Sequence, residues 1–468
     1  MSSLRRILAN FGFFLQITGL FLILPIAIGL QNGELQAVSS LIATCFLSFA
    51  AGFILNSFCE RKDLDDRTSL WLMLTTFVIL PALLMIPFIW NNVFNSGNPF
   101  DLFTNAYFET VSGFTTTGFT FVTNPQTLPV SILFYRSLVE FIGGIGFVYI
   151  IAAFLYPKDA IDEYAESFGI DRLNPNLRKV FISVVLIYTI FVAIFTVIFY
   201  FAYSPNNLLV SSCTAIDVLT GGYALSMTGG IGLLPISVLV LMVIGSLNFQ
   251  FHYNLFRLKL RSLLTPEIKL YFIVLLASAV IVSILAWVNP FDSLFNVVSM
   301  ASSTGIESFT IGTTTVPAKV FLILVGLAGG CAFSMAGGIR MERIQKIISA
   351  IRKKDDRPNR EELVSILGAI IGFFATLIIL TLIFMPIGVS FLDSVFEVGS
   401  ALTTNGISMG ATVVTMPIGY KWLMTFAMII GRVEIVSILA AIAGLPILPA
   451  AKRVAERLVS ILRKAIRR

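Results

Sequence analysis

The feature that most constrains this chain is a series of ten long apolar segments. As a helix, a segment of ~20 residues crosses the ~30 Å hydrocarbon layer of a membrane. Of the 468 residues, 57% are hydrophobic and only 12% are charged, whereas a soluble domain has about a quarter charged residues. The sequence therefore predicts an all-α integral membrane protein with ten transmembrane helices. The expected spans are 11–30, 36–58, 69–91, 130–156, 179–203, 232–256, 269–289, 317–347, 363–387 and 418–446.

Basic residues are concentrated in alternate loops. All but four of the 32 Lys and Arg lie near the N-terminus, in the loops 59–68, 157–179, 257–269 and 340–360, or in the tail 451–468. Basic loops of membrane proteins face the cytoplasm, so both termini are expected on that side. The net charge of +6 is thus a signal of topology and does not indicate nucleic-acid binding. The amphipathic tail is also suited to lie on anionic lipid.

From the third span onward, four weakly apolar segments rich in Ser, Thr and Gly lie between the spans. They align on the glycines Gly118, Gly222, Gly305 and Gly406. A residue suited to cap a helix stands thirteen positions before three of these glycines, at Asn105, Asp292 and Asp393, and a phenylalanine stands ten positions before them, at Phe108, Phe295 and Phe396. Each segment is therefore expected to be a capped helix of about ten residues, too short to span, followed by a loop.

Four such helix–loop segments predict four re-entrant pore loops in pseudo-fourfold helix–pore loop–helix repeats. Irregular backbone is tolerated at membrane depth where it lines a water-filled cavity, so the loops are expected to line one central pore. Backbone carbonyls can replace the hydration shell of potassium, and glycine permits the backbone angles that this needs. The predicted selectivity filter and potassium-binding residues are Thr116, Thr117, Gly118, Phe119, Thr220, Gly221, Gly222, Tyr223, Ser303, Thr304, Gly305, Ile306, Thr404, Asn405, Gly406 and Ile407.

These segments divide the chain into six parts. Two extra N-terminal helices occupy 1–66, and the pore repeats occupy 67–170, 171–265, 266–356 and 357–450, followed by the basic cytoplasmic tail 451–468.

Five sequence motifs resemble those of the Trk/Ktr/HKT superfamily of potassium transporters. They are FETVSGFTTTGFT (108–120), RSLVEFIGGIG (136–146), NFQFHY (248–253), GGCAFSMAGGIRMERI (329–344) and GRVEI (431–435). The two extra spans resemble the TrkH-type branch. The resemblance implies potassium-selective uptake across the cell membrane through a channel-like pore, with potassium held in the filter. It also implies a homodimer in lipid, regulated by cytoplasmic TrkA-like nucleotide-binding subunits.

Residues 329–338, GGCAFSMAGG, interrupt the eighth span with four glycines and a serine. We expect this segment to be unwound and to obstruct the pore below the filter, although glycines also serve close helix packing. The predicted gate residues are Gly329, Gly330, Ser334, Gly337, Gly338 and Arg432. Arg432, central in the last span, needs partners in the bundle interior. It either forms a barrier that binds the carbonyls of the gate or pairs with Glu140, for which Arg136 is an equal candidate.

Three acidic residues accompany the loops. Glu307 follows the third filter stretch, where it either concentrates cations at the mouth or pairs with Lys319 or Lys421. Glu109 and Glu397 each stand nine positions before a filter glycine, and we expect them to bind loop backbone.

The remaining residues argue against an enzyme. The single histidine, His252, and four scattered cysteines give no metal-ligand spacing, and no nucleophile–base pair or phosphate-binding loop is present. No covalently bound cofactor is expected. The alternatives to a potassium channel are an ion-coupled secondary transporter, which typically has inverted repeats, and a sodium-permeable channel of the same fold.

Overall fold

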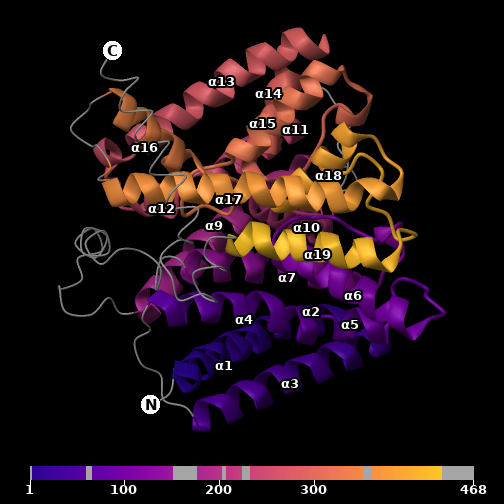
Figure 1. The fold of residues 1–468 in the computed structure, drawn as a ribbon. Helices are drawn as coiled ribbons and strands as arrows, with labels where there is room; N and C mark the ends of the chain where they lie inside the picture. The colour runs from indigo at the N-terminus through magenta and orange to yellow at the C-terminus, as the bar shows by residue number, and fades with distance from the viewer. Residues whose placement is uncertain are drawn as a thin grey trace.

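The structure is a computed structural model that describes residues 3–58, 66–150, 177–202, 207–223, 232–352, 358 and 360–434. Within these ranges every regular element is a helix, and most helices run side by side in one bundle (Figure 1). The predicted tail 451–468, most of the loop 157–179 and the part of the last span beyond 434 lie outside the described residues.

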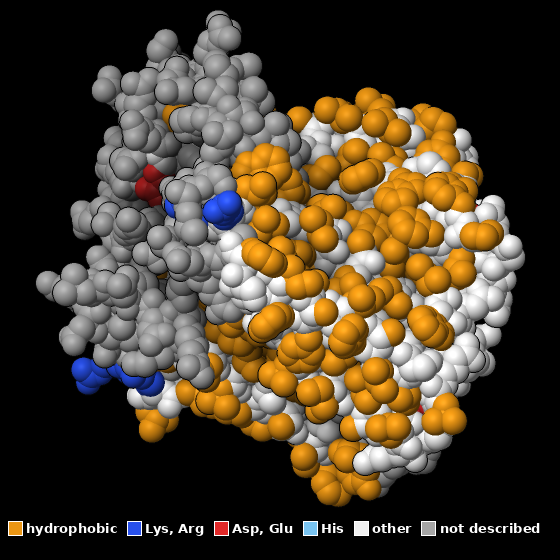
Figure 2. All heavy atoms as spheres, turned by 90° about the horizontal axis from the view of Figure 1, so that it is seen from below, with side chains coloured by type: hydrophobic (Ala, Val, Ile, Leu, Met, Phe, Trp, Pro, Cys, Tyr) orange, Lys and Arg blue, Asp and Glu red, His pale blue; other side chains and the backbone are white. Residues whose placement is uncertain are grey.

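Seven helical segments are long and apolar enough to cross a membrane. Large apolar side chains on them face outward, and Phe53 and Phe58 are 68% and 77% exposed. Figure 2 shows hydrophobic side chains spread over the described part of one face, with the few visible Lys and Arg side chains toward one side. Such a surface is stable in lipid and not in water. The segments are α1 (Ser3–Phe21) with α2 (Ile23–Gln31), α3 (Leu35–Phe58), α4 (Asp66–Leu84) with α5 (Ile86–Trp90), α7 (Val130–Ile150), α9 (Leu177–Ala202), α13 (Pro266–Ala286) and α17 (Arg360–Phe384).

The predicted span 232–256 is bent instead of straight. It consists of α11 (Leu233–Ser246) and α12 (Phe249–Phe256), which meet at 107°. Asn248 lies at the bend, where its side chain accepts a hydrogen bond from the N–H of Phe251 at 2.8 Å. This amide begins a new helix at the point where the old one ends.

The predicted span 317–347 is not one helix. It begins as α15 (Val316–Ala328), continues as non-helical chain, and resumes as α16 (Met341–Arg352). The last predicted span is described as α19 (Ile418–Val433), after which Glu434 has a positive φ of 67°.

Four short helices precede the four glycine-rich loops: α6 (Pro99–Phe114), α10 (Leu208–Thr220), α14 (Pro290–Ser302) and α18 (Phe391–Leu402). They have 12 to 16 residues, which is too short to cross a membrane. The prediction of their N-caps was wrong, because Asn105 lies inside α6 and Asp292 and Asp393 lie in the first turns of α14 and α18. The side chains that cap these helices are Asn98, Asn207, Asn289 and Ser390.

The four helix pairs close into a ring. The second helix of each repeat packs against the short helix of the next one: α7 against α10, α11 against α14, and α15 against α18. The ring closes where α19 packs against α6, so the last described helix lies beside the first repeat (Figure 1). This arrangement brings the four loops, each at the end of a short helix, toward one centre.

Candidate ion pore

The four glycine-rich loops touch one another through their backbones. Each loop contains a glycine with a positive φ angle: Gly118 (86°), Gly221 (87°), Gly305 (75°) and Gly406 (76°). A Cβ atom on Gly406 would lie 2.0 Å from the carbonyl oxygen of Thr117, and one on Gly305 would lie 2.2 Å from that of Asn405. Both the angle and the close approach require glycine at these positions.

The contacts run in one direction around the ring. The Gly118 position faces the backbone of Gly222, and the Gly221 position faces the carbonyl oxygen of Ser303. Together with the contacts of Gly305 and Gly406, each loop meets the next, and the fourth meets the first. The predicted filter residues of all four repeats are therefore neighbours in space.

The second loop differs from the other three by one residue. Thr116, Ser303 and Thr404, two positions before their glycines, have positive φ angles of 58°, 59° and 52°. In the second loop, α10 continues through Thr220, and the positive φ falls on Gly221, directly before the aligned Gly222. The shift arises because α10 ends two residues before its aligned glycine, whereas the other short helices end three or four residues before theirs.

Hydroxyl groups line the same end of the loops. The side chains of Thr116 and Thr404 are fully buried, and their hydroxyl oxygens have no hydrogen-bond partner among the described residues. Ser303 differs, because its hydroxyl donates to the carbonyl oxygen of Thr403 at 2.9 Å. Buried polar atoms normally have partners. The unpartnered oxygens at two of the four equivalent positions are therefore suited to act as ligands for a cation.

Buried side chains hold three of the loops from behind. Glu109 accepts the N–H of Phe121 at 2.8 Å, and Glu397 accepts the N–H of Met409 at 2.7 Å. In the third loop Asn296 accepts the N–H of Ser308 at 2.7 Å. These acceptors all stand nine positions before the aligned glycine, and the donors three positions after it. The prediction that Glu109 and Glu397 bind loop backbone is confirmed.

The predicted partners of Glu307 are wrong. Lys319 lies 3.8 Å from the carboxylate of Asp393, and Lys421 donates to the side chain of Asn105 at 2.8 Å. Glu307 itself accepts the N–H of Ile311 at 2.9 Å. The two lysines instead connect neighbouring repeats, because Lys319 reaches the fourth repeat and Lys421 the first.

The segment between α15 and α16 is non-helical and buried, as predicted for 329–338. Its Met335 and Ala336 are 1% exposed. The N–H of Cys331 donates to the carbonyl oxygen of Ser246 at 3.0 Å, and the N–H of Met335 donates to that of Gly245 at 3.2 Å. The C-terminal end of α11 therefore satisfies backbone groups that an unwound segment exposes.

This segment lies directly against the loops. The N–H of Gly337 donates to the hydroxyl of Ser303 at 3.0 Å. A Cβ atom on Gly337 would lie 2.3 Å from the carbonyl oxygen of Thr403, so this glycine fits a close backbone contact. A Cβ atom on Gly144 would lie 3.4 Å from the sulfur of Met335 and 3.5 Å from the methyl groups of Thr116 and Thr220, so the three side chains surround this glycine.

Arg432 contacts the middle of the same segment. Its guanidinium donates to the carbonyl oxygen of Met335 at 2.7 Å and lies 3.9 Å from the ring centre of Phe147. The alternative pairing with Glu140 is wrong, and Arg136 is not the partner of Glu140 either, because it forms an ion pair with Glu109 at 2.8 Å. Of the two predicted roles of Arg432, the geometry favours contact with the gate segment.

The sequence profile of TrkH, a family of cation transport proteins, matches residues 88–225 and 269–449. These two stretches cover more than half of the chain and include all four loops. The chain belongs to the TrkH family.

Known members resemble this TrkH-family chain along most of their length. An uncharacterised cation transporter of Methanocaldococcus jannaschii is 26% identical, over 94% of this chain and 96% of that protein. The Trk system potassium uptake protein TrkH of Salmonella typhimurium is 26% identical, over 85% of this chain and 89% of that protein. The crystal structure of the potassium transporter TrkH from Vibrio parahaemolyticus has the same fold, with a TM-score of 0.79 at 20% identity over 96% of this chain and 100% of that one.

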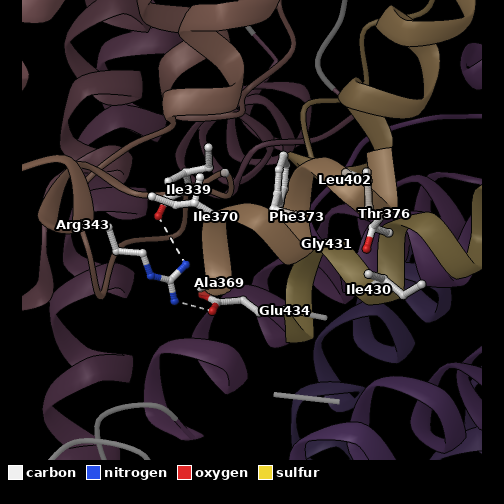
Figure 3. Close-up of a pocket in the computed structure, with 11 residues that line it drawn as sticks. Ile339, Arg343, Ala369, Ile370, Phe373, Thr376, Leu402, Ile430, Gly431 and Glu434 are labelled. Atoms are coloured by element: carbon white, nitrogen blue, oxygen red, sulfur yellow. Dashed lines mark hydrogen bonds and ion pairs between the residues drawn. The ribbon is translucent and has the colours of Figure 1, made fainter. Parts of the chain in front are cut away.

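The C-terminal end of the gate segment is tied to the end of α19. Arg340 and Arg343 both pair with Glu434, with 3.3 Å between Arg340 Nε and its Oε1 and 2.5 Å between Arg343 Nη2 and its Oε2. Figure 3 shows Arg343 turned toward Glu434 in a small pocket whose lining also includes residues of α17 and α19. Residues at the end of α19 thus contact the chain between α15 and α16 twice, Arg432 at Met335 and Glu434 at Arg340.

Sequence reasoning missed several residues of the site. Asn296 has the same offset as Glu109 and Glu397, so the repeat could have identified it. Glu267, which accepts the N–H of Ala332 at 2.6 Å, and Glu434 carried no periodic signal. Their roles depend on contacts between distant helices. His252 is fully buried against the rings of Tyr188 and Phe191, a structural position.

Proposed function

We propose that this chain takes up potassium through a central pore, with the four loops as its selectivity filter. The observation that carries the proposal is the closed ring of backbone contacts from Gly118 to Gly222, Gly221 to Ser303, Gly305 to Asn405 and Gly406 to Thr117. Closely placed carbonyl oxygens can replace the water around a potassium ion. The unpartnered hydroxyls of Thr116 and Thr404 add oxygen ligands of the same kind. The relatives named as potassium uptake proteins support the choice of ion.

The proposal includes ten spans around four re-entrant loops, with both termini in the cytoplasm. Seven helical segments are long enough to cross, or eight with the bent α11–α12 pair. We assign the remaining two spans to α15 with the non-helical segment after it, and to the predicted span 418–446 that begins with α19. Support for the orientation comes from the basic loops, which all fall on one side under this count.

The proposed gate is the segment 329–338 with Arg432. It lies against Ser303 and Thr403 at one end of the loops, where an ion would leave the filter. Family membership supports two further assignments: assembly as a homodimer, and regulation by cytoplasmic nucleotide-binding subunits of the TrkA type.

Ion flux in proteoliposomes tests the proposed function. Purified protein is reconstituted, and uptake of potassium and of sodium is measured under equal imposed gradients. We expect potassium flux to exceed sodium flux at least ~10-fold, since a carbonyl filter discriminates by ligand number and spacing. Equal rates for both ions would contradict selectivity, and flux that requires a second, coupled ion would favour a secondary transporter.

Gly118→Ser tests the filter itself. The new side chain would lie 2.7 Å from the backbone of Gly222 at a φ of 86°, so the first two loops must shift apart. We expect the potassium-to-sodium flux ratio to fall several-fold. Gly388→Ser is the matched control, because Gly388 also has a positive φ, 100°, but has no atom within 4 Å of the added side chain. The same loss of selectivity in both variants would contradict the assignment.

Deletion of 333–336 tests the gate. The deletion removes the segment that contacts Arg432 through Met335, so we expect basal potassium flux to rise while the potassium-to-sodium ratio stays high. If the thermal melt shows that the deletion variant is folded and its potassium flux is unchanged, the gate assignment is wrong.

A further inference from the structure

Glu140 is a fully buried carboxyl on α7 that faces the second loop. Its Oε1 accepts the backbone N–H of Tyr223 at 2.9 Å, and its Oε2 lies 3.4 Å from the hydroxyl of Thr220. The carboxyl occupies the space beside Gly222 so closely that a Cβ atom there would lie 1.9 Å from Oε1. The first repeat thus supplies a side chain that contacts the second loop region at Thr220, Gly222 and Tyr223.

Within the described part of the second loop, the corresponding short helix provides no equivalent acceptor. In the first, third and fourth repeats, the short helix provides its own acceptor at Glu109, Asn296 or Glu397. In the second repeat this offset falls on Cys213, a weak acceptor. The neighbouring Ser212 uses its hydroxyl to donate to the carbonyl oxygen of Leu209 within its own helix.

The first repeat also holds the side chain of Tyr223. The guanidinium of Arg136, one turn before Glu140 on α7, lies 3.9 Å from the centre of the tyrosine ring. The tyrosine hydroxyl donates to the backbone carbonyl of Glu109. The backbone, ring and hydroxyl of Tyr223 are therefore fixed by three residues that all belong to the neighbouring repeat.

We propose that Glu140 is a selectivity-determining positioning residue, whose carboxyl, supplied by the neighbouring repeat, fixes the Gly221–Gly222–Tyr223 backbone. This inference rests on the proposed function, because it assumes that these residues form one quarter of the filter. The essential property of Glu140 is its carbonyl-like acceptor oxygen. An unsupported N–H at Tyr223 would turn away to find another acceptor, and the carbonyl groups beside it would turn with it.

Two substitutions separate the acceptor from the space that it fills. Glu140→Gln keeps an oxygen for the N–H of Tyr223, and its amide nitrogen can donate to the hydroxyl of Thr220. Glu140→Ala removes the acceptor. In proteoliposomes we expect the potassium-to-sodium flux ratio to fall about 10-fold for Glu140→Ala, the scale on which a lost buried hydrogen bond acts, and to stay within about twofold of wild type for Glu140→Gln.

Glu267→Ala is the matched control. Glu267 also accepts one buried backbone N–H, that of Ala332, but in the gate segment instead of the filter. We expect this variant to change total flux and to leave the ion ratio unchanged. Thermal melts of all variants identify any that fail to fold.

The outcomes separate the two proposals. A wild-type protein without selective potassium flux would overturn the proposed function. A selective wild type whose ratio survives Glu140→Ala would overturn only the role of Glu140, as would an equal loss of ratio in Glu140→Gln and Glu140→Ala. If Glu140→Ala does not fold, Glu140→Leu, which removes the acceptor but fills the space, is compared with Glu140→Gln. An equal ion ratio in these two variants would overturn the role of Glu140.

Discussion

Arg136 and Arg432 are both buried in the bundle, at 3% and 1% exposure, yet among the described residues only Arg136 has an acidic partner. Arg136 binds the carboxylate of Glu109 through Nε and Nη2 at 3.2 and 2.8 Å. Arg432 has one backbone carbonyl and the face of Phe147, and its Nε and Nη2 have no hydrogen-bond partner among the described residues.

This difference separates a structural charge from a functional one. A buried ion pair cancels its own field, so Arg136 can hold the first and second loops without repelling a cation. An arginine with only a carbonyl and a ring keeps its positive charge. A bundle tolerates such a charge where it serves a purpose, and its place beside the gate segment suits a barrier to cations.

The largest expected effect comes from breaking the Arg136 pair. Glu109→Ala leaves a guanidinium buried without its carboxylate, which typically costs about 3–5 kcal/mol of stability. The N–H of Phe121 loses its acceptor as well. We expect a large fall in the melting temperature of the detergent-purified protein.

The double substitution Glu109→Leu with Arg136→Met provides the control. Replacing both members of a buried pair with apolar groups leaves no uncompensated charge, so the double variant should melt closer to wild type than Glu109→Ala. If both variants melt alike, the ion pair does not account for the loss.

Removing the unpaired charge should affect transport more than stability. A unit charge about 10 Å from the ion path changes the energy there by about 1–2 kcal/mol at an effective dielectric constant near 20. Arg432→Ala should therefore raise potassium flux roughly 10-fold. Arg432→Lys keeps the charge and should stay near the wild-type flux. A fall in melting temperature without a gain in flux would instead make Arg432 a structural residue like Arg136.

The smallest effect is expected for a basic residue at the surface. Lys346 on α16 is one-third exposed and lies 2.9 Å from Glu342 and 2.6 Å from Glu362. Lys346→Met should cost at most about 1 kcal/mol of unfolding free energy, as for other partly exposed pairs. A loss as large as that of Glu109→Ala would contradict the view that burial sets the strength of these interactions.

The same pair has a defined pH dependence. Burial acts to lower the pKa of Lys346, but the carboxylates of Glu342 and Glu362 outweigh it and raise the pKa above its ordinary value. The stabilisation is thus complete below the ordinary lysine pKa of ~10.4 and is lost only as the pH rises through the raised value. The difference in melting temperature between wild type and Lys346→Met should therefore be constant from about pH 6 to 9.

The sequence predicted the elements that depend on local composition. Segment length and hydropathy identified the apolar helices, and the spaced glycines identified the four loops that the structure brings together. Local patterns were less informative at helix ends. Asp292 and Asp393 have the right residue type for caps, but Asn289 and Ser390 stand three residues earlier and accept their N–H groups.

Partner choice could not be read from the sequence. Arg136 and Glu140 are one helical turn apart, the usual spacing for a pair on one helix. In the structure they diverge, because Glu109 on α6 lies closer to Arg136 and the N–H of Tyr223 on the next repeat faces Glu140. Likewise, the apolar run 232–256 is divided into two helices at Asn248. At this break the N–H of Phe249 donates to the carbonyl oxygen of Phe333 in the unwound segment.

A ring of four loops on one chain has a genetic consequence. In a channel built from four identical subunits, one codon change alters the same position in all four subunits at once. A substitution that disturbs the pore therefore disturbs it at four places. Here each codon alters a single quadrant. The second quadrant has already diverged, with its shifted glycine and its borrowed acceptor from α7. Substitutions can therefore be introduced one quadrant at a time, and the ion ratio after each one gives the weight of that quadrant in selectivity.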